Sequence, residues 1–123
     1  MILITCDGGL RNSGLELIRA LEIVQNYTLI QPLCKWKFQY GEINVLGNRV
    51  DAILILLDDN NKEQQRIGIE VVSSEKDERK AETKLTRLIT LGEFNKAYIY
   101  YRRLDDVQKE TMSRLGFFKE VRL

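Results

Sequence analysis

Two short segments decide the fold of this chain: residues 49–57, RVDAILILL, and residues 67–74, IGIEVVSS. Both are runs of apolar and β-branched residues of strand length, and each contains one acid, Asp51 in the first and Glu70 in the second. An unpaired carboxylate inside a buried strand is costly, so each acid needs a partner or water. Either each strand turns one face to solvent, or both acids point into one cleft and hold a metal ion.

Composition narrows the class of protein. The chain has 123 residues and is 44% hydrophobic, which predicts one domain over residues 1–123 with a substantial core. No apolar run approaches the roughly 18 residues of a membrane span, and no basic, apolar leader opens the chain, so we expect a cytoplasmic protein without membrane contact. The chain has no histidine and two cysteines without CxxC spacing, which argues against a zinc site and excludes a histidine triad.

The periodicity around the two segments predicts an α/β fold. Apolar residues at helical spacing, with capping and stop signals, predict helices over residues 13–25, 75–91 and 105–115. Alternating or continuous apolar runs predict strands over residues 2–4, 28–40, 43–45, 50–57, 65–72, 97–101 and 117–123. Gly41 is predicted to form a turn, and residues 58–62 a hairpin loop. The helix between the strands at 65–72 and 97–101 predicts a parallel βαβ unit, in a mixed central sheet flanked by helices.

This order of elements resembles the PD-(D/E)XK nuclease superfamily, which includes restriction-endonuclease-like enzymes and archaeal Holliday-junction resolvases. The resemblance runs from about Ser13 to Tyr101. Val50-Asp51 stands where the family has Pro-Asp, and Glu70-Val71-Val72 where it has Glu-x-Lys. The resemblance implies a restriction-endonuclease-like core and a Mg²⁺- or Mn²⁺-dependent endonuclease that hydrolyses phosphodiester bonds in DNA or RNA, with a homodimer as one possible assembly.

The same resemblance implies a set of site residues. Asp51 and Glu70 would bind the metal, and Glu16 in the first helix would be an additional ligand. The chemistry is consistent, since Mg²⁺ prefers carboxylate oxygens and makes a bound water nucleophilic. Each of these residues also has a simpler interpretation. Asp51 can be an acid at the start of a strand beside Arg49, and Glu70 can form a salt bridge that faces solvent. Glu16 can be the partner of Ser13 in a capping box.

The family's lysine position is occupied by Val72, which cannot donate a hydrogen bond or bind phosphate. A lysine from elsewhere can fill this role: Lys76, Lys80 and Lys84 repeat every four residues in the following helix, and Lys76 or Lys80 is expected to be nearest. Lys35 or Lys37 is a further source of charge. The other interpretations are a site that uses metal alone and a catalytically inactive nuclease-fold module that binds nucleic acid or a protein partner.

Overall fold

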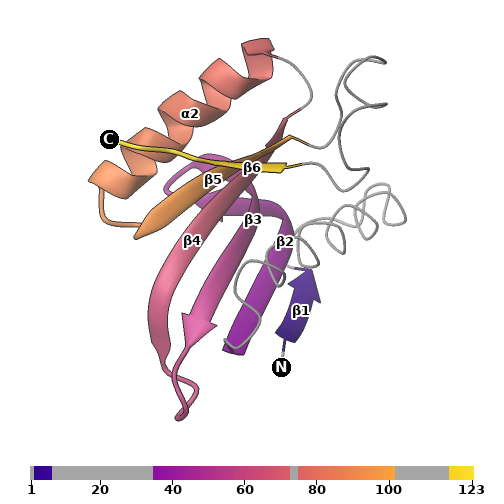
Figure 1. The fold of residues 1–123 in the computed structure, drawn as a ribbon, viewed down its shortest axis with the longest axis vertical. Coiled ribbons are helices and arrows are strands. Elements are labelled where there is room, and N and C mark those ends of the chain that lie inside the picture. Colours follow the sequence, from indigo (N-terminus) through magenta and orange to yellow (C-terminus); the bar gives the residue numbers. More distant parts are fainter. Residues whose placement is uncertain (1, 7–34, 73–74, 102–116) are drawn as a thin grey trace.

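The computed structural model describes residues 2–6, 35–72, 75–101 and 117–123, which form six strands and one helix (Figure 1). The strands are β1 (Ile2–Cys6), β2 (Lys35–Val45), β3 (Asn48–Leu57), β4 (Glu63–Val72), β5 (Lys96–Tyr101) and β6 (Phe117–Glu120). The helix is α2 (Glu75–Thr90). Among the described residues, no helix is long and apolar enough to span a membrane.

The six strands make one mixed sheet in the order β1-β2-β3-β4-β5-β6. β2, β3 and β4 form an antiparallel meander, while β1 pairs with β2 and β4 pairs with β5 in parallel. The chain passes from β4 to β5 through α2, so the predicted parallel βαβ unit is confirmed, as is the mixed α/β class. The predicted helices over residues 13–25 and 105–115 lie outside the described residues.

β2 differs from the prediction at Gly41. The expected turn there is wrong, because β2 runs without a break from Lys35 to Val45. The β2–β3 pairing instead shifts by one residue between Tyr40↔Ala52 and Ile43↔Val50, which is a β-bulge, and Gly41 has φ 107°. Glycine suits this backbone conformation because it has no Cβ to clash.

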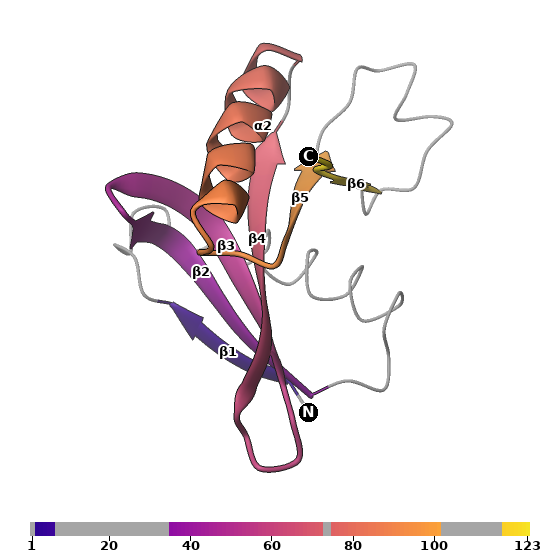
Figure 2. The same ribbon diagram turned by 90° about the vertical axis from the view of Figure 1, so that its left-hand side faces the viewer.

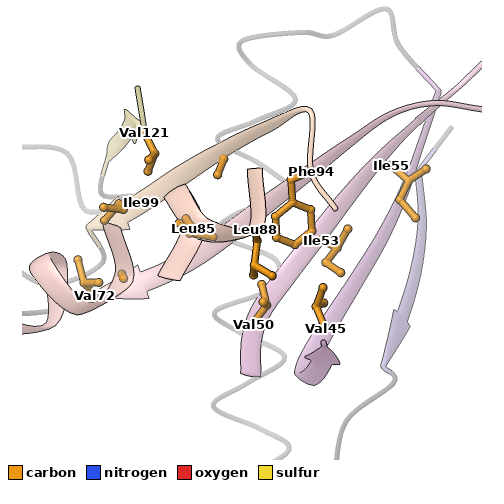
Figure 3. Close-up of a cluster of buried hydrophobic side chains, with 12 residues drawn as sticks. Val45, Val50, Ile53, Ile55, Val72, Leu85, Leu88, Phe94, Ile99 and Val121 are labelled. Carbon is orange, nitrogen blue, oxygen red and sulfur yellow. The ribbon is translucent and has the colours of Figure 1, made fainter. Parts of the chain in front are cut away.

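Helix α2 packs on one face of the sheet, against β4 and β5 (Figure 2). Its first turn carries Glu75, Asp77 and Glu78, whose negative charges interact favourably with the positive end of the helix dipole. Its buried stripe, Ala81, Leu85 and Leu88, joins a hydrophobic cluster with sheet residues that include Val50, Ile53, Val72 and Ile99 (Figure 3). A second buried cluster contains Trp36, Phe38, Ala52, Leu54, Ile67, Ile69 and Tyr100. The strands β3 and β4 therefore bury residues of both clusters, as a central position requires.

Gly68 sets how closely the chain after α2 approaches the sheet. The ring of Phe94 lies where a Cβ on Gly68 would project, and Phe94 itself is buried in the cluster beneath α2. The turn that follows α2 is closed at Gly92, whose φ is 80° and whose N–H donates to the Ile89 carbonyl. A glycine inside a strand here marks close approach of another part of the chain.

We expect Gly68→Ala to destabilise the protein by about 1–3 kcal/mol, because the added methyl overlaps Phe94 in a packed core. Urea unfolding followed by circular dichroism measures this. The double variant Gly68→Ala/Phe94→Leu is expected to recover part of the loss, since leucine leaves room for the methyl. A Gly68→Ala variant as stable as the wild type would contradict the close packing.

Candidate functional site

The structure brings Asp51 and Glu70 together at the end of the β3–β4 ladder. The register ends at Ala52↔Ile69, and one further step places Asp51 opposite Glu70. The two carboxyl groups lie close enough for Asp51 to raise the pKa of Glu70. Asp51 Oδ2 also accepts a hydrogen bond from the Val71 backbone N–H at 2.8 Å. Glu70 is only 6% exposed, and it is the one buried charged residue among those the structure describes.

The β-bulge of β2 lies directly across from Asp51. Asp51 is the single residue that lies across from Gly41 and Glu42, between the two registers of the β2–β3 ladder. Bulges bend a strand, locally disrupt its pairing and redirect a side chain. At the same position the β3–β4 pairing ends, so the Asp51 carboxylate, rather than a β3 carbonyl, accepts the N–H of Val71.

Lys84 of α2 is the third charged residue at this position, beside Asp51 and Glu70. Its ammonium Nζ donates to Glu70 Oε1 at 2.5 Å and to the Arg49 carbonyl at 2.7 Å. The Lys84 side chain is 30% exposed, whereas that of Glu70 is 8% exposed, so the lysine reaches from solvent to a buried acid. We call Asp51, Glu70 and Lys84 the acid–lysine site.

The pKa of Glu70 is raised from 4.5 to about 8. Burial is the largest cause, because removal from water disfavours the charged form, and the hydrogen bond and negative charge of Asp51 act in the same direction. Lys84 opposes these effects and lowers the pKa, but it does not cancel them. Glu70 therefore keeps its proton to a higher pH than an exposed glutamate, unless a further cation lies beside it.

The helical phase explains why Lys84, and not the expected Lys76 or Lys80, contacts Glu70. Four residues advance an α-helix by about 400°, so the lysine stripe rotates by about 40° at each step. Lys84 lies beside the buried residue Leu85, at the edge of the face that meets the sheet, whereas Lys80 and Lys76 lie progressively farther round and are exposed. The sequence shows the repeat of lysines every four residues, but it does not show which of these lysines lies next to the sheet.

Val72 occupies a place where a lysine would not fit. It is 4% exposed and packs in the hydrophobic cluster under α2. Because side chains alternate along β4, Val72 and Glu70 share the helix-covered face. An ammonium at position 72 would be buried among apolar side chains, so in this chain the cation comes from the helix instead.

Lys35 and Lys37 lie too far from the acids to take part. Lys35 pairs with Leu57 and Lys37 pairs with Ile55, which lie six and four residues along β3 from Asp51, or about 20 Å and about 13 Å away. Both lysines line a separate cavity of about 520 Å³, together with Arg66 and apolar residues of β2 and β3. Glu16 lies outside the described residues, and its predicted role as a ligand stays a prediction.

Two carboxylates are the metal-binding groups that the described part of the chain gathers at this site. No group of three or more histidine, cysteine, aspartate or glutamate residues that could hold a metal occurs within residues 2–6, 35–72, 75–101 and 117–123. The Asp51–Glu70 pair still suits Mg²⁺ or Mn²⁺, because Mg²⁺ is commonly held by one or two carboxylates, with water and substrate phosphate completing its shell.

Comparisons of the chain with protein-family models, with curated proteins and with solved structures gave no match.

The raised pKa of Glu70 predicts a pH-dependent stability. Between pH values of about 4.5 and 8 the folded protein holds a proton that the unfolded chain has released, so the free energy of unfolding falls as pH rises through this window. Glu70→Gln removes this titration. We expect its stability relative to the wild type to improve from about pH 5 to about pH 9, by at most about 5 kcal/mol, since a pKa difference of one is worth about 1.4 kcal/mol.

Urea unfolding at a series of pH values measures this difference. The matched control is Glu75→Gln, which changes an exposed carboxylate at the start of α2. Parallel profiles of stability against pH for the wild type and Glu70→Gln would show that Glu70 titrates near its ordinary pKa.

Proposed function

We propose that this protein is a metal-dependent nuclease with a restriction-endonuclease-like core that hydrolyses phosphodiester bonds in DNA or RNA. The observation that carries the proposal is the acid–lysine site: two carboxylates from adjacent strands meet, and an ammonium from the next helix reaches the same point. Hydrolysis of a phosphodiester needs both kinds of group, because negative charge accumulates on the phosphate while a water is made nucleophilic.

The acid pair fits a divalent cation on chemical grounds. A buried glutamate beside an aspartate carries more negative charge than its surroundings stabilise, which the raised pKa of Glu70 expresses. Asp51 and Glu70 would hold Mg²⁺ or Mn²⁺ through their oxygens. The ion, when bound, would polarise the phosphate and lower the pKa of a bound water.

The chain's own residues have distinct parts in this proposal. The hydrogen bond from the Val71 N–H fixes the orientation of the Asp51 carboxylate. The Arg49 carbonyl and Glu70 hold the Lys84 ammonium at the edge of the site, where its partial exposure leaves it accessible to a phosphate. Lys84 would supply the positive charge that the family places two residues after the glutamate, so the motif is completed from α2 rather than from β4.

One observation favours a second candidate, a nuclease-fold module that binds nucleic acid without cleaving it. Lys84 already forms a short ion pair with Glu70, and the described residues bring only two carboxylates together at this site. A site in which the lysine replaces the metal would keep the architecture and lose hydrolysis.

Cleavage assays separate the two candidates. We expect the wild type to cut plasmid, single-stranded or branched DNA, or RNA, with Mg²⁺ or Mn²⁺ and not with EDTA. Asp51→Asn and Glu70→Gln should abolish cleavage. Lys84→Met keeps the aliphatic stem but removes the charge, so we expect a loss of about 10²–10³-fold, the size seen when one transition-state donor is removed. Lys84→Arg should retain part of the activity.

The controls are Asp59→Asn and Lys62→Met, which change exposed residues of the β3–β4 hairpin. Circular dichroism shows whether each variant is folded. Absence of cleavage with both metals on all four substrates would refute hydrolysis, and salt-dependent binding in that case would support the module that binds without cleaving.

A further inference from the structure

A cavity of about 460 Å³ lies beside α2 and opens next to the acid–lysine site. Its lining residues are Asn48 at the start of β3 and, on the helix, Arg79, Lys80, Thr83, Lys84 and Arg87. Four of these six residues are cations, and no acid is among the described residues that line it. We call it the basic cavity.

Three of the four cations form no ion pair among the described residues, although Arg79 lies close enough to Glu78 to interact with it electrostatically. The ion pairs found in this part of the chain join Arg66 to Glu63, Lys84 to Glu70, Lys119 to Glu78 and Arg122 to Glu120. Arg79, Lys80 and Arg87 take part in none of them. Lys80 and Arg87 each lie within one helical turn of Lys84, where like charges repel. The cavity thus concentrates positive charge that an anion would neutralise.

The neutral residues of the cavity are already engaged within the protein. The Asn48 amide Nδ2 donates to the carbonyls of Val45 and Leu46, each at 3.3 Å, and the Thr83 hydroxyl donates to the Arg79 carbonyl at 3.0 Å. The donors left for a ligand are therefore mainly ammonium and guanidinium groups. Such groups contact phosphates well, whereas base edges are usually read by a mixture of donors and acceptors.

Lys84 connects the basic cavity with the acid pair. It lines the cavity and its ammonium also contacts Glu70. From Lys80 to Arg87 the helix advances about 10 Å. This length matches about three phosphates of one strand, at 3.4 Å of helix axis per nucleotide in B-DNA.

We propose that the basic cavity binds the phosphodiester backbone of a nucleic acid strand, independently of its sequence, next to the phosphate that lies at the acid–lysine site. The placement beside that site rests on the proposed function. The row of cations suits a polymer better than a single phosphate ion, since Lys80, Lys84 and Arg87 are spread along two turns of the helix.

Fluorescence anisotropy with labelled DNA duplexes of unrelated sequence, measured in EDTA over a range of salt concentrations, tests the proposal without cleavage. Lys80→Ala/Arg87→Ala is expected to weaken binding of every duplex to a similar degree and to reduce the slope of log K against log salt by about 2, one for each lost phosphate contact. The matched control is Lys62→Ala/Lys96→Ala, which removes two exposed cations outside the cavity. It should leave the slope nearly unchanged.

Equal effects of the two double variants would overturn the proposal, because binding would then follow net charge alone. A large difference between sequences in the loss would overturn the sequence-independent contact. Displacement of the DNA by poly-L-glutamate at matched charge concentration would indicate an acidic polypeptide ligand and would also overturn it. The proposed hydrolysis is tested separately, by cleavage assays of the wild type with Mg²⁺ or Mn²⁺. If the wild type does not cleave but the salt slopes change as expected, the nuclease proposal is refuted and the proposed contact with the backbone is supported.

Discussion

The burial of the Glu70 carboxylate beside Asp51 is the constraint on which the site depends. A buried acid next to a second acid is unfavourable unless a proton or a cation offsets the charge. In this structure two contacts offset the charge: the Val71 N–H donates to Asp51, and the Lys84 ammonium donates to Glu70. A neutral or apolar residue at position 70 would fit the strand at less cost.

The surrounding fold supplies the geometry for this compensation. The bulge in β2 releases Asp51 from regular pairing, and the end of the β3–β4 ladder leaves the Val71 N–H for the Asp51 side chain. The contact between Gly68 and Phe94 brings the chain after α2 close to the sheet. Since α2 is packed through Leu85 and its neighbours, Lys84 is held at the margin of the buried face rather than in bulk solvent.

The helix α2 therefore has two chemically different sides. Its buried stripe fixes the helix on β4 and β5, while the adjacent stripe carries the cations of the basic cavity. Lys84 lies between the two and belongs to both the acid–lysine site and the cavity. This position couples the arrangement of the core to the electrostatics of the surface: a small rotation of α2 would change the contact with Glu70 and the shape of the cavity together.

The sequence alone determined the local elements and the identity of the two acids. Continuous apolar runs predicted β3 and β4. Helical periodicity and the glycine at position 92 predicted α2 and its end. The single acid within each apolar strand identified Asp51 and Glu70 as candidate site residues. The strand–helix–strand order also predicted the parallel pairing of β4 with β5. These features follow from short-range periodicity, which a sequence records directly.

Only the tertiary structure decided which lysine meets the acids and why position 72 holds a valine. The rotation of the lysine stripe relative to the sheet depends on how the helix packs, and Val72 is needed for that packing. The sequence likewise does not distinguish the bulge at Gly41 from a turn, because a glycine with positive φ is suited to both. Long-range register and helix phase arise from contacts between residues distant in the chain, so local periodicity identified the acids, and the packing of α2 on the sheet selected Lys84.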